Sequence, residues 1–128
     1  MVTGFLSLNE RAALTQAIFR VLKKWDVPER SMPNLLGLDP NLKTRDFNRY
    51  RLGAALPDNP RVYHRVARLL EIDNALHKFF PHSELSADLW VTTPRMKFGY
   101  ITPLNLMLKE GEEGIAMVLR ALYDQETW

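Results

Sequence analysis

The side chains able to take part in chemistry are few, and the histidines come first because the chain contains no cysteine. Asp73 and His77 stand four residues apart in a predicted helix, a spacing that places both on one face as possible ligands of a metal ion. Two ligands are fewer than a zinc site needs, so a surface histidine is the simpler interpretation. His64 lies among arginines, and His82 follows a proline. We therefore predict no metal site and no bound cofactor.

Catalysis has no better support in the sequence. The absence of cysteine excludes disulfides, thiolate metal ligands and a cysteine nucleophile. No Ser/His/Asp set, glycine-rich phosphate loop or paired-carboxylate motif stands in a supporting context. We predict no catalytic residues and no enzymatic activity. A small metal-dependent enzyme built on Asp73 and His77 is the weakest of the alternatives, and it would carry stoichiometric metal when purified.

Charge is divided unevenly along the chain, although the net charge is only +2. Residues 41–68 carry seven basic side chains and two acidic ones, a net charge of +5. Residues 83–128 carry four basic and seven acidic side chains, a net charge of −3. A basic middle and an acidic end indicate two surfaces with different partners.

The elements that must position these side chains are all predicted to be helices. Each begins at a side chain able to cap its first turn or at a proline, with a capping box at Ser7 and Glu10 and helix starts at Ser83 and Thr102 among them. Apolar residues then recur with helical spacing. The predicted spans are about 8–25, 32–36, 40–52, 60–80, 84–91, 103–109 and 112–125. No alternation of period two is long enough for a strand, so the predicted fold class is all-α.

The helices predicted over 32–36 and 40–52 fit a helix-turn-helix. Gly37 permits the tight turn between them, and Asp39-Pro40 suits the start of the second helix, the aspartate as cap and the proline in the first position. In that motif the second helix lies in the major groove of DNA, with its N-terminal side chains at base edges. The predicted DNA-binding residues are Lys43, Thr44, Arg45, Asn48, Arg49 and Arg51.

Phosphate contacts are predicted for Arg51 and for the arginines that follow it, at positions 61, 65 and 68. A solvated basic face with no nucleic-acid partner is the competing interpretation, because runs of charge are usually only that. The turn pattern together with the charge of +5 favours DNA binding. Tyr50 is expected to pack against the fold, and Gly53 to end the helix.

The segment Leu89–Trp128 carries the most specific pattern of the chain. In order it contains Leu89-Trp90, Thr93-Pro94, Phe98-Gly99, Thr102-Pro103-Leu104, Gly111, Gly114-Ile115 and Val118. Most of its apolar residues have helical spacing and are predicted to be core. Tyr123 follows a core leucine and Trp128 is the last residue, so these two aromatic residues are predicted to anchor a partner.

These spacings make the segment resemble the C-terminal toxin-binding domain of the Xre/MbcA/ParS antitoxin family. The residues before it resemble the Xre-like helix-turn-helix that precedes this domain, in Leu35-Leu36-Gly37, in Phe47–Gly53 and in Phe79-Phe80-Pro81. The resemblance implies two domains, a DNA-binding domain over residues 1–76 and a toxin-binding domain over residues 77–128.

An antitoxin of a type II toxin–antitoxin system is what the resemblance implies. Its partner would be a RES-domain or ParT-like toxin that consumes NAD, and as a homodimer it would bind operator DNA and repress its own operon. The predicted toxin-binding residues are Arg95, Lys97, Tyr100, Tyr123 and Trp128. No run approaches the roughly 20 apolar residues of a membrane span. With no secretion signal at its start, we expect a cytoplasmic protein without a membrane partner.

Two positions depart from the family pattern. The family often has a second glycine after Phe-Gly, where this chain has Tyr100, and a positive φ there would strain a tyrosine. The family often has an acidic residue after Thr-Pro-Leu, where this chain has Asn105, so a charge near a helix N-terminus is lost. We expect the loop around Tyr100 to differ locally.

A stand-alone transcription regulator with a helix-turn-helix, whose C-terminal helices only dimerise, is the main alternative. Deletion of residues 123–128 separates the two hypotheses. An antitoxin would lose neutralisation and keep DNA binding, whereas a plain regulator would be unaffected or would lose its dimer.

Overall fold

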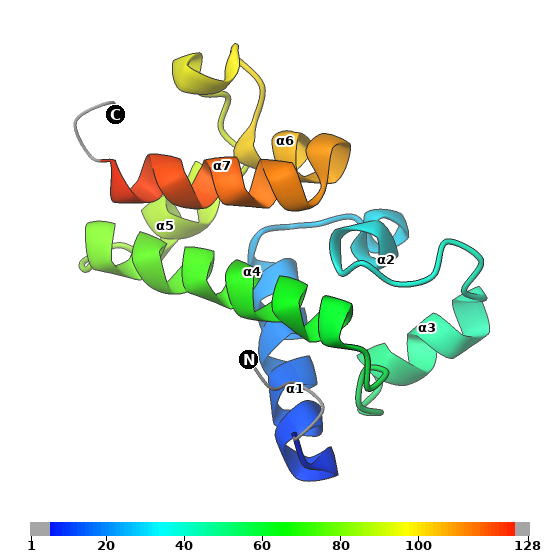
Figure 1. Cartoon of the computed structure of the whole chain (residues 1–128). Coiled ribbons are helices and arrows are strands. Elements are labelled where there is room, and N and C mark those ends of the chain that lie inside the picture. The colour runs from blue at the N-terminus through cyan, green and yellow to red at the C-terminus, as the bar shows by residue number, and fades with distance from the viewer. Residues whose placement is uncertain (1–5, 125–128) are drawn as a thin grey trace. The chain divides into compact units, whose positions relative to one another are not determined.

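A computed structural model describes residues 6–124, and seven α-helices account for most of them (Figure 1). The predicted all-α fold class is confirmed. The helices pack into two units, an N-terminal unit, Met1–Ala67, and a C-terminal unit, Arg68–Trp128. Helix α4, Pro60–Phe79, runs through the boundary between them. The predicted division after residue 76 falls in this same helix and stays a prediction. None of the helices within residues 6–124 combines the length and hydropathy needed to cross a bilayer.

The N-terminal unit contains α1, Leu8–Lys24, a 3-10 turn over Glu29–Ser31, α2, Met32–Leu35, and α3, Thr44–Arg51. The capping box predicted at Ser7 is present, since Ser7 Oγ accepts from the Glu10 amide at 3.0 Å and Glu10 Oε1 accepts from the Ser7 amide at 2.8 Å. The apolar face of α1 then supplies the core. Its fully buried members include Ile18 and Leu22, with Trp25, Leu35, Leu36 and Leu56 from the following segments.

Helix α3 begins later than the sequence predicts, and this part of the prediction was wrong. Asp39 does not cap a helix at Pro40 but folds the chain locally, because its Oδ1 accepts from the Asn41 amide at 2.9 Å. Such a turn competes with a helix start for the same backbone donors. The loop therefore continues to Lys43, and Thr44 is the first helical residue. Figure 1 shows this long connection between α2 and α3.

The loop after α3 is held to α1 and α4 through one residue, Leu56. Thr15 is buried, and its Oγ1 accepts from the Leu56 amide at 2.9 Å while donating to the Arg11 carbonyl at 2.7 Å. The Leu56 carbonyl accepts from the Tyr63 hydroxyl at 2.8 Å and from Arg11 Nη1 at 3.3 Å. The backbone N–H and C=O of the buried Leu56 are thus both bonded to side chains, as a buried backbone requires.

This arrangement makes the stability of the fold sensitive to alkaline pH. Burial raises the pKa of the Tyr63 phenol above its ordinary value, although its contacts with Thr15 and Arg11 act in the opposite direction. The neutral phenol is therefore favoured in the folded state. The stability that it adds is complete below pH about 10, the ordinary tyrosine value, and is lost as pH rises through the higher pKa of the folded state.

We expect Tyr63→Phe to be less stable than the unsubstituted protein by about 1 kcal/mol at pH 7, because the hydrogen bond to Leu56 is lost. The gap should narrow above pH 10, since only the unsubstituted protein must then ionise a buried phenol. Urea unfolding at pH 7 and at pH 11 measures both free energies. A gap that stays constant over this range would contradict the prediction.

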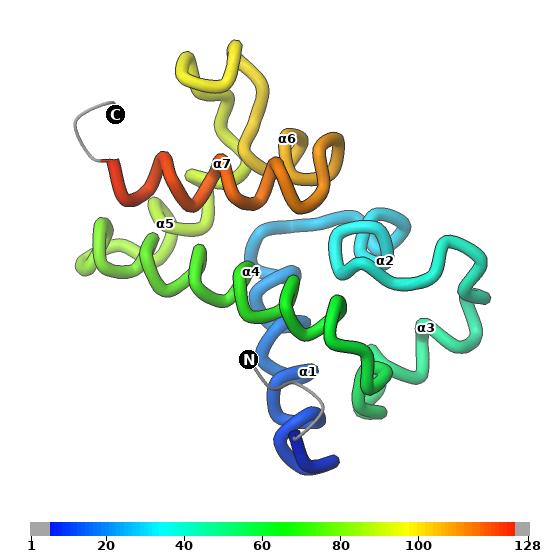
Figure 2. The backbone as a smooth tube through the Cα atoms, in the orientation of Figure 1, coloured from blue at the N-terminus to red at the C-terminus, as the bar shows by residue number. Residues whose placement is uncertain are grey.

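The C-terminal unit holds the rest of α4 and then α5, Glu84–Trp90, a 3-10 turn over Met96–Phe98, α6, Pro103–Glu110, and α7, Glu112–Tyr123. The predicted caps are present, with Ser83 Oγ accepting from the Ser86 amide at 3.1 Å and Thr102 Oγ1 from the Asn105 amide at 3.0 Å. Figure 2 shows the α6–α7 hairpin. The fully buried side chains of this unit include Leu69, Ile72, Leu76, Met107, Ile115 and Leu122.

Helices α6 and α7 approach each other closely at Gly114. A Cβ atom built on this glycine would lie 2.4 Å from the Leu106 carbonyl oxygen and 3.0 Å from the Met107 Cα. Both are backbone atoms, which cannot rotate away as a side chain does. The glycine is therefore required by the packing of the two helices.

Candidate interaction surfaces

The candidate DNA-binding residues lie at the start of α3. Lys43 is its N-cap residue, and Thr44 and Arg45 occupy the first turn. All three are exposed, as is Arg49 one turn later. The late start of α3 thus places the basic side chains at a helix N-terminus, the part of a recognition helix that reaches base edges. Arg45 lies 3.7 Å from the Asp46 carboxylate, and 79% of its side chain is accessible.

Two of the predicted residues are engaged with each other. Arg51 donates from Nε and Nη2 to the Asn48 side-chain oxygen, at 3.2 and 2.9 Å, and its Nη1 lies 3.2 Å from a Glu29 carboxylate oxygen. Contact of Arg51 with a phosphate would replace the Glu29 ion pair. Release of the Asn48 side-chain oxygen would require Arg51 Nε and Nη2 to leave it as well. On this face, the exposed Arg45 and Arg49 need the least rearrangement.

Arg65 is a structural residue, which the charge pattern did not reveal. Its exposed fraction is 7%, and its Nη1 donates to the carbonyls of Asn34 at 3.0 Å and Leu35 at 3.2 Å, at the end of α2. Gly37 lies beside this side chain and has a left-handed backbone at φ +73°, a conformation that favours glycine. The phosphate contact predicted for Arg65 would require its removal from these carbonyls. Arg61, one turn earlier, is exposed.

Between α5 and α6 the chain forms a loop whose two ends lie side by side, the 95–101 loop, drawn in yellow in Figure 1. An antiparallel bridge joins Arg95 and Ile101 at its base, where the Arg95 amide donates to the Ile101 carbonyl at 3.1 Å. The Arg95 guanidinium lies over the ring of the buried Trp90, 4.9 Å from its centroid, and burial lowers its pKa. This is a cation–π contact, and it fixes the base of the loop.

The tip of the 95–101 loop has the conformation that the family's second glycine suggested. Gly99 and Tyr100 are both left-handed, with φ of 71° and 68°. The Tyr100 side chain is exposed, as is that of Met96. Lys97 Nζ lies 3.9 Å from the Asp124 carboxylate, which ties the loop to the end of α7. The loop thus presents two large apolar side chains from a fixed backbone.

Tyr123, the next predicted contact residue, is exposed at the last turn of α7. Its hydroxyl donates to the Glu71 carboxylate on α4. This hydrogen bond is the main cause of the raised pKa of the Tyr123 phenol, with burial and the charge of Glu71 adding to it. A shallow groove beside the ring is lined by residues of α4 that include Asn74, Lys78 and Phe79. Trp128, also predicted as a contact, lies outside the described residues.

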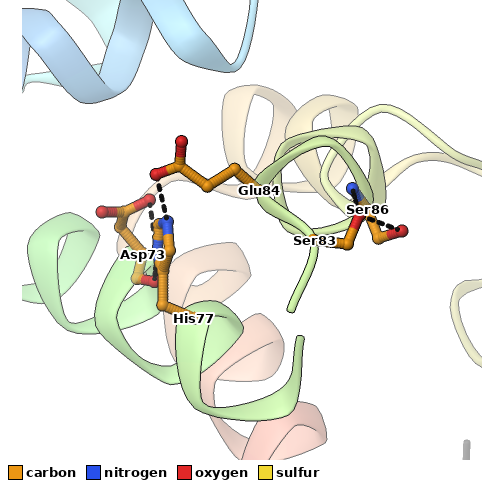
Figure 3. Close-up of polar contacts among 5 residues, drawn as sticks. All are labelled: Asp73, His77, Ser83, Glu84 and Ser86. Atoms are coloured by element: carbon orange, nitrogen blue, oxygen red, sulfur yellow. Dashed lines mark hydrogen bonds and ion pairs between the residues drawn. The ribbon is translucent and has the colours of Figure 1, made fainter. Parts of the chain in front are cut away.

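His77 lies beside carboxylates of α4 and α5 (Figure 3). His77 Nδ1 donates to the Asp73 carbonyl at 2.8 Å and lies 3.6 Å from its carboxylate, while Nε2 lies 3.7 Å from Glu84. Asp88 completes a set of three ligand atoms, with Asp73 and His77, that lie within 4.8 Å of one another. Asp88 was not singled out from the sequence, because it comes from another helix. The set could hold a divalent cation, and the 3.7 Å approach of His77 to Glu84 also joins α4 to α5.

A scan against protein-family models gave one result that bears on these surfaces. Residues 75–126 match the antitoxin Xre/MbcA/ParS C-terminal toxin-binding domain. The match confirms the resemblance that the segment from Leu89 predicts, and it supports an antitoxin role. The matched segment includes the 95–101 loop, α5 to α7 and Tyr123. Searches of curated proteins and of solved structures found no match.

Proposed function

We propose that this chain is the antitoxin of a type II toxin–antitoxin system. It binds and blocks a toxin that consumes NAD, of the RES-domain or ParT-like class, through residues 77–128. The observation that carries the proposal is the match of residues 75–126 to an antitoxin's toxin-binding domain. The antitoxin acts by covering its partner rather than by catalysis. Its contact residues are Arg95, Lys97, Tyr100, Tyr123 and Trp128.

DNA binding by residues 1–76 is the second part of the proposal, and it makes the protein a repressor of its own operon. Support comes from the exposed basic side chains at the start of α3 and from the +5 charge of residues 41–68. The residues proposed to contact DNA are Lys43, Thr44, Arg45, Asn48, Arg49 and Arg51. Two copies would present two such helices to the two halves of a palindromic operator, so a homodimer is the expected form.

Co-expression with the product of the adjacent gene tests the toxin partnership. We expect a complex that survives purification, and we expect the chain to restore growth to cells that make the toxin. Neither outcome is expected of a plain transcription regulator. Failure to form a complex, together with failure to protect cells, would refute the antitoxin proposal.

The stand-alone regulator is distinguished by truncation before Tyr123. The antitoxin proposal expects the truncated chain to bind operator DNA and to neutralise the toxin poorly. A truncated chain that neutralises as well as the full one would remove Tyr123 from the contact surface.

A further inference from the structure

We propose that Tyr100 is the residue through which the 95–101 loop anchors the toxin, and that the fold holds this tyrosine in an unfavourable backbone conformation to present it. The inference rests on the proposed function and makes Tyr100 the dominant contact with the toxin. The toxin is then expected to have an apolar recess of the size of an aromatic ring.

The backbone of the 95–101 loop is left-handed at two successive residues, Gly99 and Tyr100, with φ of 71° and 68°. Glycine adopts this region readily, but the Cβ of a bulky residue such as tyrosine disfavours it. The Arg95 carbonyl accepts from the Phe98 amide at 3.0 Å and from the Tyr100 amide at 2.9 Å. These bonds keep Tyr100 from relaxing to an extended conformation.

No side-chain hydrogen bond or ion pair described within residues 6–124 compensates for this conformation. The Tyr100 side chain is 67% exposed, so it buries little apolar surface. Among the hydrogen bonds and ion pairs of residues 6–124, none involves its hydroxyl. A strained residue whose side chain is exposed and makes no compensating hydrogen bond points to a role outside the fold.

The 95–101 loop offers a partner a preformed surface. Its base is fixed by the Arg95–Trp90 contact and by the bridge to Ile101, so binding requires little ordering of the backbone. Lys97 is occupied by Asp124, and Met96 is 74% exposed. The outward surface is therefore a methionine and a tyrosine, an apolar pair with a phenol hydroxyl. Aromatic side chains on rigid supports are typical interface anchors.

The occupant is the toxin and not a second copy of this chain, because the loop lies in the segment that matches a toxin-binding domain. A toxin surface that fits the loop must bury both apolar side chains. A homodimer built on the loop is the competing occupant, which the test below distinguishes.

The test is the pair Tyr100→Gly and Tyr100→Phe in the full chain. Tyr100→Gly relieves the strain and removes the ring. We expect its melting temperature to rise by about 3–5 °C, and its affinity for the product of the adjacent gene to fall by roughly 30-fold or more. Tyr100→Phe keeps both the strain and the ring, so its melting temperature should be unchanged and its affinity should stay within about twofold of that of the unsubstituted protein. Leu8→Ala, at a residue that is 64% exposed on α1 and lies outside residues 75–126, is the control and should leave affinity unchanged.

Three outcomes overturn the inference. A melting temperature that falls or stays constant in Tyr100→Gly shows that the tyrosine is not strained. An affinity within about threefold of the unsubstituted protein shows that Tyr100 is not the anchor. Dissociation of a dimer, seen by light scattering with toxin binding intact, assigns the loop to a second copy. If the unsubstituted protein does not bind the adjacent gene's product, the proposed function fails instead, and a rise in melting temperature would still establish the strain.

Discussion

Gly114→Ala should destabilise the C-terminal unit by about 3 kcal/mol and abolish toxin binding at 37 °C. The added Cβ would lie 2.4 Å from the Leu106 carbonyl oxygen, a distance at which the two helices must move apart. Separation of α6 and α7 would open the packing around Met107 and Ile115, which are fully buried. The same change in an ordinary helix interior stabilises by about 0.5–1 kcal/mol, so the expected sign is reversed here.

Thermal and urea unfolding of Gly114→Ala measure the loss, and co-purification with the toxin measures the functional effect. The matched control is Glu113→Ala, at the exposed neighbouring residue of α7, which should change stability by less than about 0.5 kcal/mol. Operator binding by Gly114→Ala should persist, because the residues proposed to contact DNA lie in the other unit. A variant as stable as the unsubstituted protein would show that α6 and α7 are not packed this closely.

Arg45→Ala and Arg49→Ala together should weaken binding to the operator by about 2–6 kcal/mol, if each side chain contacts a base edge. Both residues are exposed, on the first two turns of α3. Loss of any phosphate contact would also lower the slope of affinity against salt concentration by about one for each contact. Fluorescence anisotropy with DNA from upstream of the gene, at several salt concentrations, measures both quantities.

The matched control is Arg120→Ala, an exposed arginine of α7 that carries the same charge outside the proposed DNA surface. It should leave operator affinity unchanged. If the double variant and the control bind alike at every salt concentration, α3 is not the recognition helix. Toxin neutralisation by the double variant should be intact, which separates the two proposed activities.

Local chemistry explains why the helix starts could be predicted from the sequence. Ser7, Ser83 and Thr102 each cap the helix that follows them, and a cap depends on residues only two or three positions away. The same local reasoning failed at Asp39, where the side chain formed a turn in place of a cap. Sequence alone could not choose between two uses of one aspartate.

Burial was harder to predict than helical structure. Arg65 lies three residues after Val62 and four before Leu69, so its position on the apolar face of α4 was visible in the spacing. The prediction of a phosphate contact for Arg65 followed the basic charge of residues 41–68 instead of that spacing. The grouping of His77 with Asp88 could not be predicted, because it depends on how α4 and α5 pack. At Tyr100 the sequence predicted a local difference from the family pattern, whereas the structure keeps the left-handed backbone that a glycine there would favour.

The loop held at Leu56 has a consequence for engineering the protein. Residues 53–59 have the glycine, proline and aspartate of a connection that would ordinarily accept a tag, a linker or a circular-permutation break. Tolerance to insertion depends instead on whether the local backbone is buried and bonded, and Leu56 is both, through Thr15 and Tyr63. An inserted residue would shift its peptide out of reach of both side chains. The lengthening that surface loops usually accept would therefore not be tolerated in this one.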